Sequence, residues 1–381
     1  MRGIWWLACV AVLTAACSSG ETSEDQSWTG ESVATESTDP VEPSSTAPKT
    51  VAATTTTELL PIALAPGDPW IVYEGPFYER DQNVGNRLVR PDGSDDHWAT
   101  PQVPLPKGGW QMHPDWSPDG SLLAFSAEDA TDDDKPRELM TLDLWVSQPD
   151  GTGAERVLDC VLPCVDTDDP AWSPDGTKLA FIEFDENDGN AVFSLRSMDV
   201  KSKVVTTLAV ATGADEFQSP RWSPDGQRVV LELSHWTDAT SSGELAETAI
   251  AVVDLRDSAP APTVITDWSL WATYPDWHPT EDLIVFSTRP WTALDDGPSN
   301  LFTIRPDGSD VTQLTQFGAG ETRAVQPTWT PDGTRIIFTA VEGDGFGDPT
   351  MAIIQRDGTG IQSATSSGPM FGTHPRLRPG A

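Results

Sequence analysis

Short apolar runs of about five residues recur from residue 71 to the end of the chain, and polar turns separate them. Five of these runs follow one phrase, in which a tryptophan stands before Ser-Pro-Asp-Gly or a close variant of it. In that phrase proline presets φ for a type I turn, serine and aspartate bond to nearby backbone, and glycine takes positive φ. The phrase therefore predicts a tight turn between two β-strands.

Each repeat holds two further apolar runs and a second turn, often Pro-Asp-Gly, so that four short strands fall in a period of about 50 residues. This pattern is typical of a β-propeller blade. The first run, Ile71–Gly75, has no tryptophan phrase before it, and a last degenerate phrase, His374–Gly380, ends the chain. We therefore predict an all-β, six-bladed propeller over residues 67–381, with four antiparallel strands per blade. The C-terminal strand should complete the first blade and close the ring.

The repeated tryptophans are expected to lie in the core, where a large flat side chain packs against the neighbouring blade. They occupy equivalent positions in successive repeats, and a leucine takes the sixth place: Trp116, Trp172, Trp222, Trp277, Trp329 and Leu377.

Residues 1–16 are expected to be a lipoprotein-type export signal. One base, Arg2, precedes the apolar stretch Ile4–Ala16, which is too short to span a bilayer. Leu13–Cys17 resembles a bacterial lipobox, although Thr14 stands where an aliphatic residue is usual. We expect lipidation of Cys17 and a membrane-anchored location outside the cytoplasm, with a plain secreted protein as the alternative. Residues 17–66, rich in Ser, Thr, Pro and Glu, predict a disordered stalk.

Charge and cysteine content narrow the choice of partners and compartment. The chain has 59 aspartates and glutamates against 23 lysines and arginines, a net charge of -36. This balance argues against a nucleic-acid partner, because phosphate needs a basic face. Export leads to an oxidising compartment, so Cys160 and Cys164 predict a disulfide. A two-cysteine metal site is the alternative.

The Trp-Ser-Pro-Asp-Gly phrase with a following Leu-Ala-Phe run resembles the WD-like propeller repeat of the TolB family. Trp116–Gly120 with Leu123–Phe125, and Trp172–Gly176 with Leu179–Phe181, carry the resemblance most clearly. It implies the propeller fold and an envelope scaffold. Similar repeats also form the gating propellers of prolyl-oligopeptidase-like peptidases and the body of some pectate-fragment lyases. The chain departs from TolB in having no separate folded N-terminal domain, and from the peptidases in having no hydrolase domain.

The residue before proline in each phrase begins the innermost strand, so six side chains should ring the mouth of the central channel. Two histidines and one aspartate among them, His113, Asp169 and His374, suit a divalent metal, and the lyase-like relatives hold a channel metal through histidines. We expect no cofactor, with Ca²⁺ or another divalent metal as the alternative. The six residues are His113, Asp169, Ser219, Tyr274, Gln326 and His374.

Acidic loops are expected on the face that holds the channel mouth, and they include Asp132–Asp134, Asp166–Asp169 and Asp185–Asp188. We predict a non-catalytic, envelope-anchored monomer that binds a protein, a peptide or a glycan, with a cationic partner favoured by the charge. The binding surface would be the acidic loop face or the channel mouth. One alternative is a metal-dependent, lyase-like carbohydrate-active enzyme built on His113, Asp169 and His374. A sensor or solute binder delivered by the stalk is another.

Overall fold

The computed structural model describes residues 69–75, 84–100, 103, 105, 109–128, 141–187, 190–237, 244–289, 298–342, 349–365 and 372–380. The predicted export signal, Cys17, the stalk and Asp132–Asp134 lie outside these residues. The described part is all-β apart from one short 3₁₀ helix, η2 (Trp268–Leu270). Within it, no helix has the length and apolar character needed to cross a membrane.

Four of the sheets are four-stranded and antiparallel. The first contains both chain ends, in the order β24 (Thr373–Leu377), β1 (Ile71–Gly75), β2 (Gly85–Val89) and β3 (His97–Trp98). The second is β12 (Asp215–Trp222), β13 (Arg228–Trp236), β14 (Leu245–Asp254) and β15 (Pro262–Val264). The third is β16 (Ala272–Trp277), β17 (Ile284–Thr288), β18 (Leu301–Ile304) and β19 (Thr312–Gln313). The fourth is β20 (Arg323–Trp329), β21 (Arg335–Val341), β22 (Pro349–Gln355) and β23 (Gln362–Ser363).

The remaining sheet has eight strands and two antiparallel halves. One half is β4 (Gln111–Trp116), β5 (Leu123–Glu128), β6 (Leu142–Ser147) and β7 (Glu155–Leu158). The other is β8 (Cys164–Trp172), β9 (Lys178–Asn187), β10 (Asn190–Asp199) and β11 (Val205–Val210). A single parallel pair, Leu142 with Asp166, joins β6 to β8.

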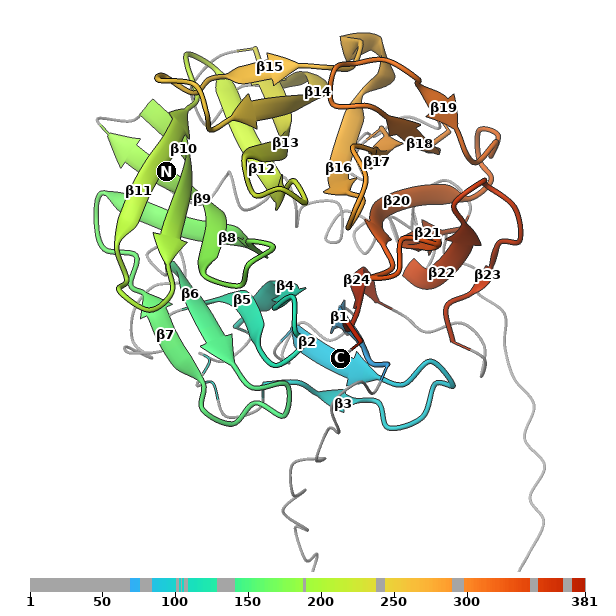
Figure 1. The fold of residues 1–381 in the computed structure, drawn as a ribbon, viewed down its shortest axis with the longest axis horizontal. Coiled ribbons are helices and arrows are strands. Elements are labelled where there is room, and N and C mark those ends of the chain that lie inside the picture. Colours follow the sequence, from blue (N-terminus) through green and yellow to red (C-terminus); the bar gives the residue numbers. More distant parts are fainter. Residues whose placement is uncertain are drawn as a thin grey trace, which may run out of the picture.

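The sheets are arranged in a ring around a central axis, with β4, β8, β12, β16, β20 and β24 innermost (Figure 1). The ring closes where β24 pairs with β1, in a register that sets Ile71 opposite Leu377. The Trp116 indole on β4 adds a hydrogen bond to the carbonyl of Arg376 on β24 (3.2 Å). This is the β-propeller arrangement that the repeats predict, closed by the C-terminal strand.

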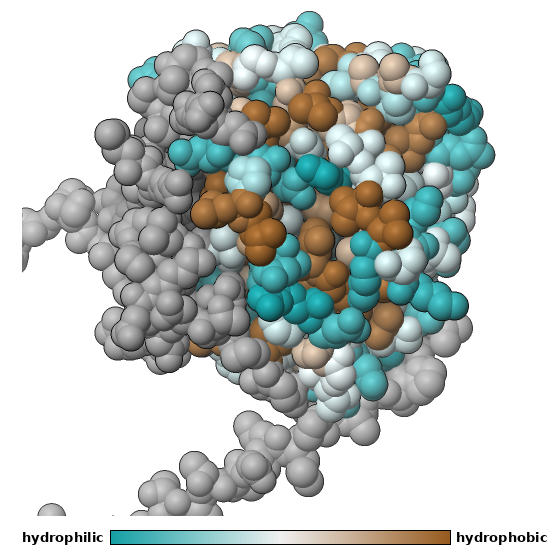
Figure 2. Space-filling model, turned by 90° about the vertical axis from the view of Figure 1, so that its left-hand side faces the viewer, coloured by the Kyte–Doolittle hydropathy of each residue, from teal (hydrophilic) through white to brown (hydrophobic). Residues whose placement is uncertain are grey.

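Hydrophobic clusters fill the space between neighbouring sheets. One such cluster joins Val285 and Leu301 of the third sheet to Trp329, Ile336 and Phe338 of the fourth. Each cluster draws on two sheets or, in one case, on the two halves of the eight-stranded sheet, so each of these units is stable only beside its neighbours. Figure 2 shows the outer wall on the side of β10 and β11, where hydrophobic residues form separate groups among hydrophilic ones.

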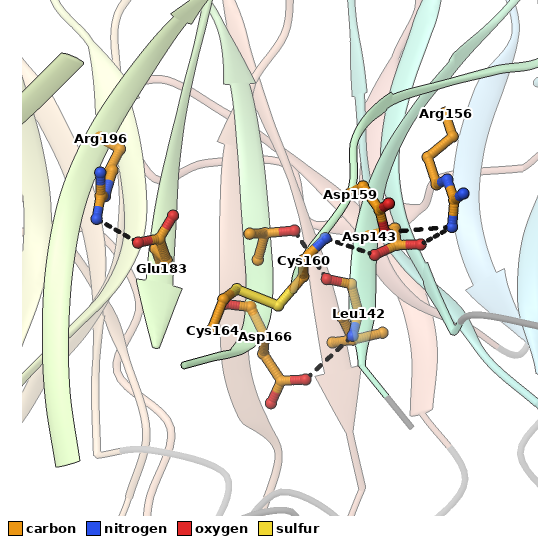
Figure 3. The surroundings of a disulfide bond; sticks show 10 residues. Leu142, Asp143, Arg156, Asp159, Cys160, Cys164, Asp166, Glu183 and Arg196 are labelled. Carbon is orange, nitrogen blue, oxygen red and sulfur yellow. Dashed lines mark hydrogen bonds and ion pairs between the residues drawn. A yellow bond between two sulfur atoms is a disulfide. The ribbon is translucent and has the colours of Figure 1, made fainter. Parts of the chain in front are cut away.

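A disulfide joins Cys160 and Cys164 at the entry to β8, with a Cα–Cα distance of 5.4 Å (Figure 3). The carboxylate of Asp143 on β6 accepts a hydrogen bond from the backbone N–H of Cys160 (2.9 Å) and pairs with Arg156 (2.9 Å). The bridge therefore lies against buried parts of the preceding strands and pins this short connection to them.

Candidate functional site

The six residues predicted at the channel mouth share an unusual backbone conformation. Each has φ between +49° and +54°, the left-handed region that residues other than glycine seldom adopt. In the five innermost strands from β4 to β20, the strand register shifts at this position, as in a β-bulge. A bulge re-aims the side chain beside it. The six residues are His113, Asp169, Ser219, Tyr274, Gln326 and His374.

Side-chain oxygens accept hydrogen bonds from the N–H groups of five of these six residues. Four of these bonds link neighbouring sheets: His113 N–H to Glu74, Ser219 N–H to Asp169 (2.9 Å), Tyr274 N–H to Glu232 (3.1 Å), and His374 N–H to Gln326 (3.2 Å). The N–H of Asp169 bonds instead to its neighbour Asp168 (2.8 Å). The N–H groups of the left-handed residues therefore hold hydrogen-bond acceptors in place around the channel mouth. Three of these acceptors are carboxylates from another sheet.

Glu74 on β1 lies between the two histidines. Its Oε2 is 2.9 Å from His374 Nδ1, and its Oε1 is 4.0 Å from His113 Nε2. The imidazoles meet edge to face, with centroids 4.6 Å apart. The three residues offer ligand atoms within 4.8 Å of one another, and so have the composition and spacing of a metal site.

His113 is surrounded by carboxylates. Its Nδ1 is 2.7 Å from Asp168 and 3.4 Å from Asp169. Burial alone would lower the pKa of His113, but Asp168, Asp169 and Glu74 together raise it well above 6.5. Burial likewise opposes ionisation of Glu74, yet His374 and His113 lower the pKa of Glu74 to about 2. The carboxylate and the His113 imidazolium therefore carry opposite charges near neutral pH.

Two further acids, Glu216 and Glu232, are buried beside this group. Burial raises the pKa of Glu216 to about 7, against hydrogen bonds from Gln218 (2.6 Å) and the Trp236 indole (2.7 Å). Burial, reinforced by the nearby Glu216 and Asp169, raises the pKa of Glu232 to about 8. Both carboxylic acids should therefore release their protons to solvent when a cation binds beside them, because the cation stabilises the charged form that burial disfavours.

A second layer of charge crosses the channel two residues further along the innermost strands. Arg376 lies 3.5 Å from Asp115 and 3.9 Å from Asp276, and Arg221 lies 3.8 Å from Asp276. Burial raises the pKa of Asp276 to about 7 and that of Asp115 to about 6 despite the arginines. These four side chains, from β4, β12, β16 and β24, link strands across the ring.

The structure brings predicted mouth residues from different sheets close together. His374 contacts Gln326 (Nε2 to Nε2, 2.9 Å), and its ring centroid is 5.9 Å from that of Tyr274. Glu74, rather than Asp169, completes the group of metal-ligating atoms with the two histidines. Ser219 takes part through its backbone, which bonds to Asp169.

Sequence reasoning missed Glu74 and Glu232. Glu74 and Glu232 stand inside runs that are otherwise apolar, Ile71–Gly75 and Val229–Leu233, and both side chains are buried. An acid in the middle of a buried strand is rare unless it is paired, so this placement was the available signal. Glu216, which follows Asp215 at the start of β12, is one of the acids expected on the face that holds the channel mouth.

Comparisons with known proteins identify the fold. No family model matches the chain. An uncharacterized protein of Agrobacterium fabrum is 26% identical over 225 residues, which are 58% of this chain and 67% of that protein. The Tol-Pal system protein TolB of Alcanivorax borkumensis is 34% identical over 65 residues, 17% of this chain and 14% of that protein.

Solved structures agree on the architecture. TolB from Acinetobacter baumannii superposes with a TM-score of 0.55 at 16% identity, covering 82% of this chain and 67% of that chain. A puromycin hydrolase superposes with a TM-score of 0.51 at 16% identity, covering 80% of this chain and 46% of that chain. The chain therefore has a TolB-like β-propeller fold, which enzymes and non-enzymes share.

Proposed function

We propose that this protein is a non-catalytic, envelope-anchored propeller that binds a positively charged segment of a protein or peptide at the channel mouth. Division of the eight-stranded sheet at its single β6–β8 pair would give six blades, each with one bulged residue at the mouth. The likeness to a Tol-Pal system protein and the predicted lipid anchor at Cys17 support the envelope location.

The observation that carries the proposal is the convergence of five carboxyl groups around the mouth: Glu74, Asp168, Asp169, Glu216 and Glu232. In the described part of the chain, neither Glu216 nor Glu232 forms an ion pair, and the groups that donate hydrogen bonds to them are neutral. A lysine or arginine side chain entering there would supply the missing positive charge. The layer of Asp115, Arg221, Asp276 and Arg376 crosses the channel beyond the mouth, so the segment should dock at the mouth without threading through the ring.

Calorimetric titration of the full chain with acetylated tetralysine amide tests this proposal. We expect saturable binding, weakened about tenfold or more when Glu216→Gln and Glu232→Gln are combined. Glu155→Gln is the matched control, because the Glu155 side chain is 66% exposed on β7, where it pairs with Lys203. Absence of binding, or equal affinity in the double variant and the native chain, would overturn the proposal.

A metal-dependent carbohydrate-active enzyme is the second candidate, favoured by the ligand atoms of Glu74, His113 and His374. Thermal unfolding of protein that has been treated with a chelator, with and without added Mn²⁺ or Zn²⁺, tests for a metal site at these three residues. A bound metal at a hundredfold excess over Kd should stabilise the fold by about 2.7 kcal/mol, and Glu74→Gln should remove that gain. Metal-dependent cleavage of acidic oligosaccharides, lost in His374→Ala, would favour the enzyme over the binding protein.

A further inference from the structure

The repeated tryptophans end the innermost strands next to the Ser-Pro-Asp-Gly turns, and one of them differs from the rest. Trp116, Trp172, Trp277 and Trp329 are buried, with 4–7% of their surface exposed. Trp222, at the end of β12, is partly exposed and lines a cleft. The repeat itself offers an internal comparison that explains the difference.

Arginines of the preceding sheet cover two of the buried tryptophans. The Arg378 guanidinium carbon lies 5.4 Å from the ring centroid of Trp116, and that of Arg228 lies 4.9 Å from the ring centroid of Trp277. Arg378 is the first residue after the tryptophan position of its own repeat, and Arg228 is the sixth after Trp222. Both are cation–π contacts.

Other side chains at the same two positions lie near the remaining buried rings. His278, again the first residue after a tryptophan, meets Trp329 edge to face at 4.7 Å. Leu122, again the sixth, packs in the hydrophobic cluster that contains Trp172. Three of the four buried tryptophans therefore have a ring contact from the first or sixth position of the preceding repeat, and the fourth, Trp172, shares a hydrophobic cluster with the residue at the sixth position.

At Trp222 these two positions hold Ser173 and Lys178, and Lys178 is exposed. The described part of the chain places neither a guanidinium nor a second aromatic ring over the Trp222 indole. A cleft of about 320 Å³ remains there, and its walls include Trp222, Pro174, Pro224, Asp175, Asp225 and Lys178.

The acids of the cleft match those that hold the arginine in the next repeat. Arg228 bonds to Asp225 of its own turn (3.4 Å) and to Asp282 of the following turn (2.7 Å). Asp175 and Asp225 stand in the corresponding turns on either side of the cleft. Hydrogen bonds from Ser173 and neighbouring groups lower the pKa of Asp175, so this acid is ionised at neutral pH.

We infer that the cleft over Trp222 binds a guanidinium group, presented by an arginine side chain of a partner polypeptide. The guanidinium would stack on the indole as Arg228 stacks on Trp277, with the carboxylates of Asp175 and Asp225 as hydrogen-bond acceptors. The rings of Pro174 and Pro224 offer apolar contact to the arginine stem. This site lies beside the Ser-Pro-Asp-Gly turns, where Trp222 follows the mouth residue Ser219 by three positions on β12. It does not depend on the function proposed for the channel mouth.

Fluorine NMR of the full chain labelled with 5-fluorotryptophan tests the inference, with acetyl-arginine amide as the probe. The Trp222 resonance is identified by its loss in Trp222→Phe. It should shift saturably with the probe, and acetyl-citrulline amide, which is neutral and similar in shape, should bind at least tenfold more weakly. Asp175→Asn should weaken binding of the arginine probe about threefold or more.

Lys178→Arg provides the sharpest variant, because it places a guanidinium at the position from which Arg228 covers Trp277. The Trp222 resonance should already be shifted without the probe, and the affinity for the probe should fall at least tenfold. Lys201→Arg, the same change at another exposed lysine, should behave as the native chain.

Four results would overturn the inference. The first is no response of Trp222 to acetyl-arginine amide, and the second is an equal response to the citrulline probe or in Lys178→Arg. The third is a response to N-acetylglucosamine with none to arginine, which would make the cleft a carbohydrate site. Tighter binding of free arginine than of the blocked amide would contradict a polypeptide partner.

Discussion

At the scale of single residues, the channel mouth is organised by its backbone. A residue other than glycine in the left-handed region costs about 1–3 kcal/mol, and the ring repeats this cost at each mouth position. Carboxylates of the neighbouring sheets offset part of this cost by accepting hydrogen bonds from the backbone N–H groups, as Glu232 does from Tyr274. These acids are thereby held in place before any ligand arrives, and such preorganisation favours binding.

Glu232 gives the clearest prediction of pH dependence. Its folded pKa of about 8 lies above the ordinary 4.5, so the folded chain retains a proton that the unfolded chain loses between these values. The contribution of Glu232 to the free energy of unfolding is therefore fully present below about pH 4.5 and is lost as the pH rises through about 8. Glu232→Gln keeps a neutral side chain throughout. We expect the variant to be about 1–3 kcal/mol more stable than the native chain at pH 8, with little difference at pH 5.

Urea unfolding at the two pH values measures this difference. Glu155→Gln, on the exposed side of β7, should leave stability unchanged at both. A Glu232→Gln variant that is less stable than the native chain at pH 8 would show that the charged form of Glu232 stabilises the fold.

At the scale of elements, β24 has more roles than a typical edge strand. It pairs with β1, its Arg376 carbonyl accepts the Trp116 indole N–H, and Arg378 covers the Trp116 ring. Removal of residues 372–381 should therefore expose the edge of β1 and uncover Trp116. We expect this truncated chain to lose at least 5 kcal/mol of unfolding free energy, the order of a whole domain's stability, and to unfold without a cooperative transition.

Circular dichroism melting checks the truncation, with a chain that lacks only Gly380 and Ala381 as the control. A cooperative transition at the native temperature in the longer truncation would mean that ring closure by β24 contributes little.

The buried charges of the second layer connect four innermost strands, and they should act as one unit. Arg376→Met leaves Asp115 and Asp276 without one of their arginines, so we expect a loss of about 2–4 kcal/mol. Asp276→Asn in the same chain should then cost less than it does alone, by about 1 kcal/mol or more. A double-mutant cycle by denaturant unfolding measures this coupling, and strictly additive losses would show that the pairs are independent.

At the scale of the whole molecule, the repeats predicted the sheet content, the ring and its closure, because turn chemistry and apolar runs are local signals. The prolines also located the six mouth residues. The left-handed backbone at these residues was not predictable, since it arises from the bulge that appears only when two strands pair. The positions of Glu74 and Glu232 beside the mouth depend on contacts between sheets, as does the exposure of Trp222.

The measurement that tests the central claim most directly is calorimetry of acetylated tetralysine amide binding at pH 7.5 in two buffers of different ionisation enthalpy. If the cation ionises Glu216 and Glu232, whose pKa values are about 7 and about 8, binding must release protons. The apparent enthalpy should then differ between the buffers, and the affinity should rise from pH 6 to pH 8. Absence of binding, or binding without proton release and with equal affinity at both pH values, would contradict a cation-binding channel mouth.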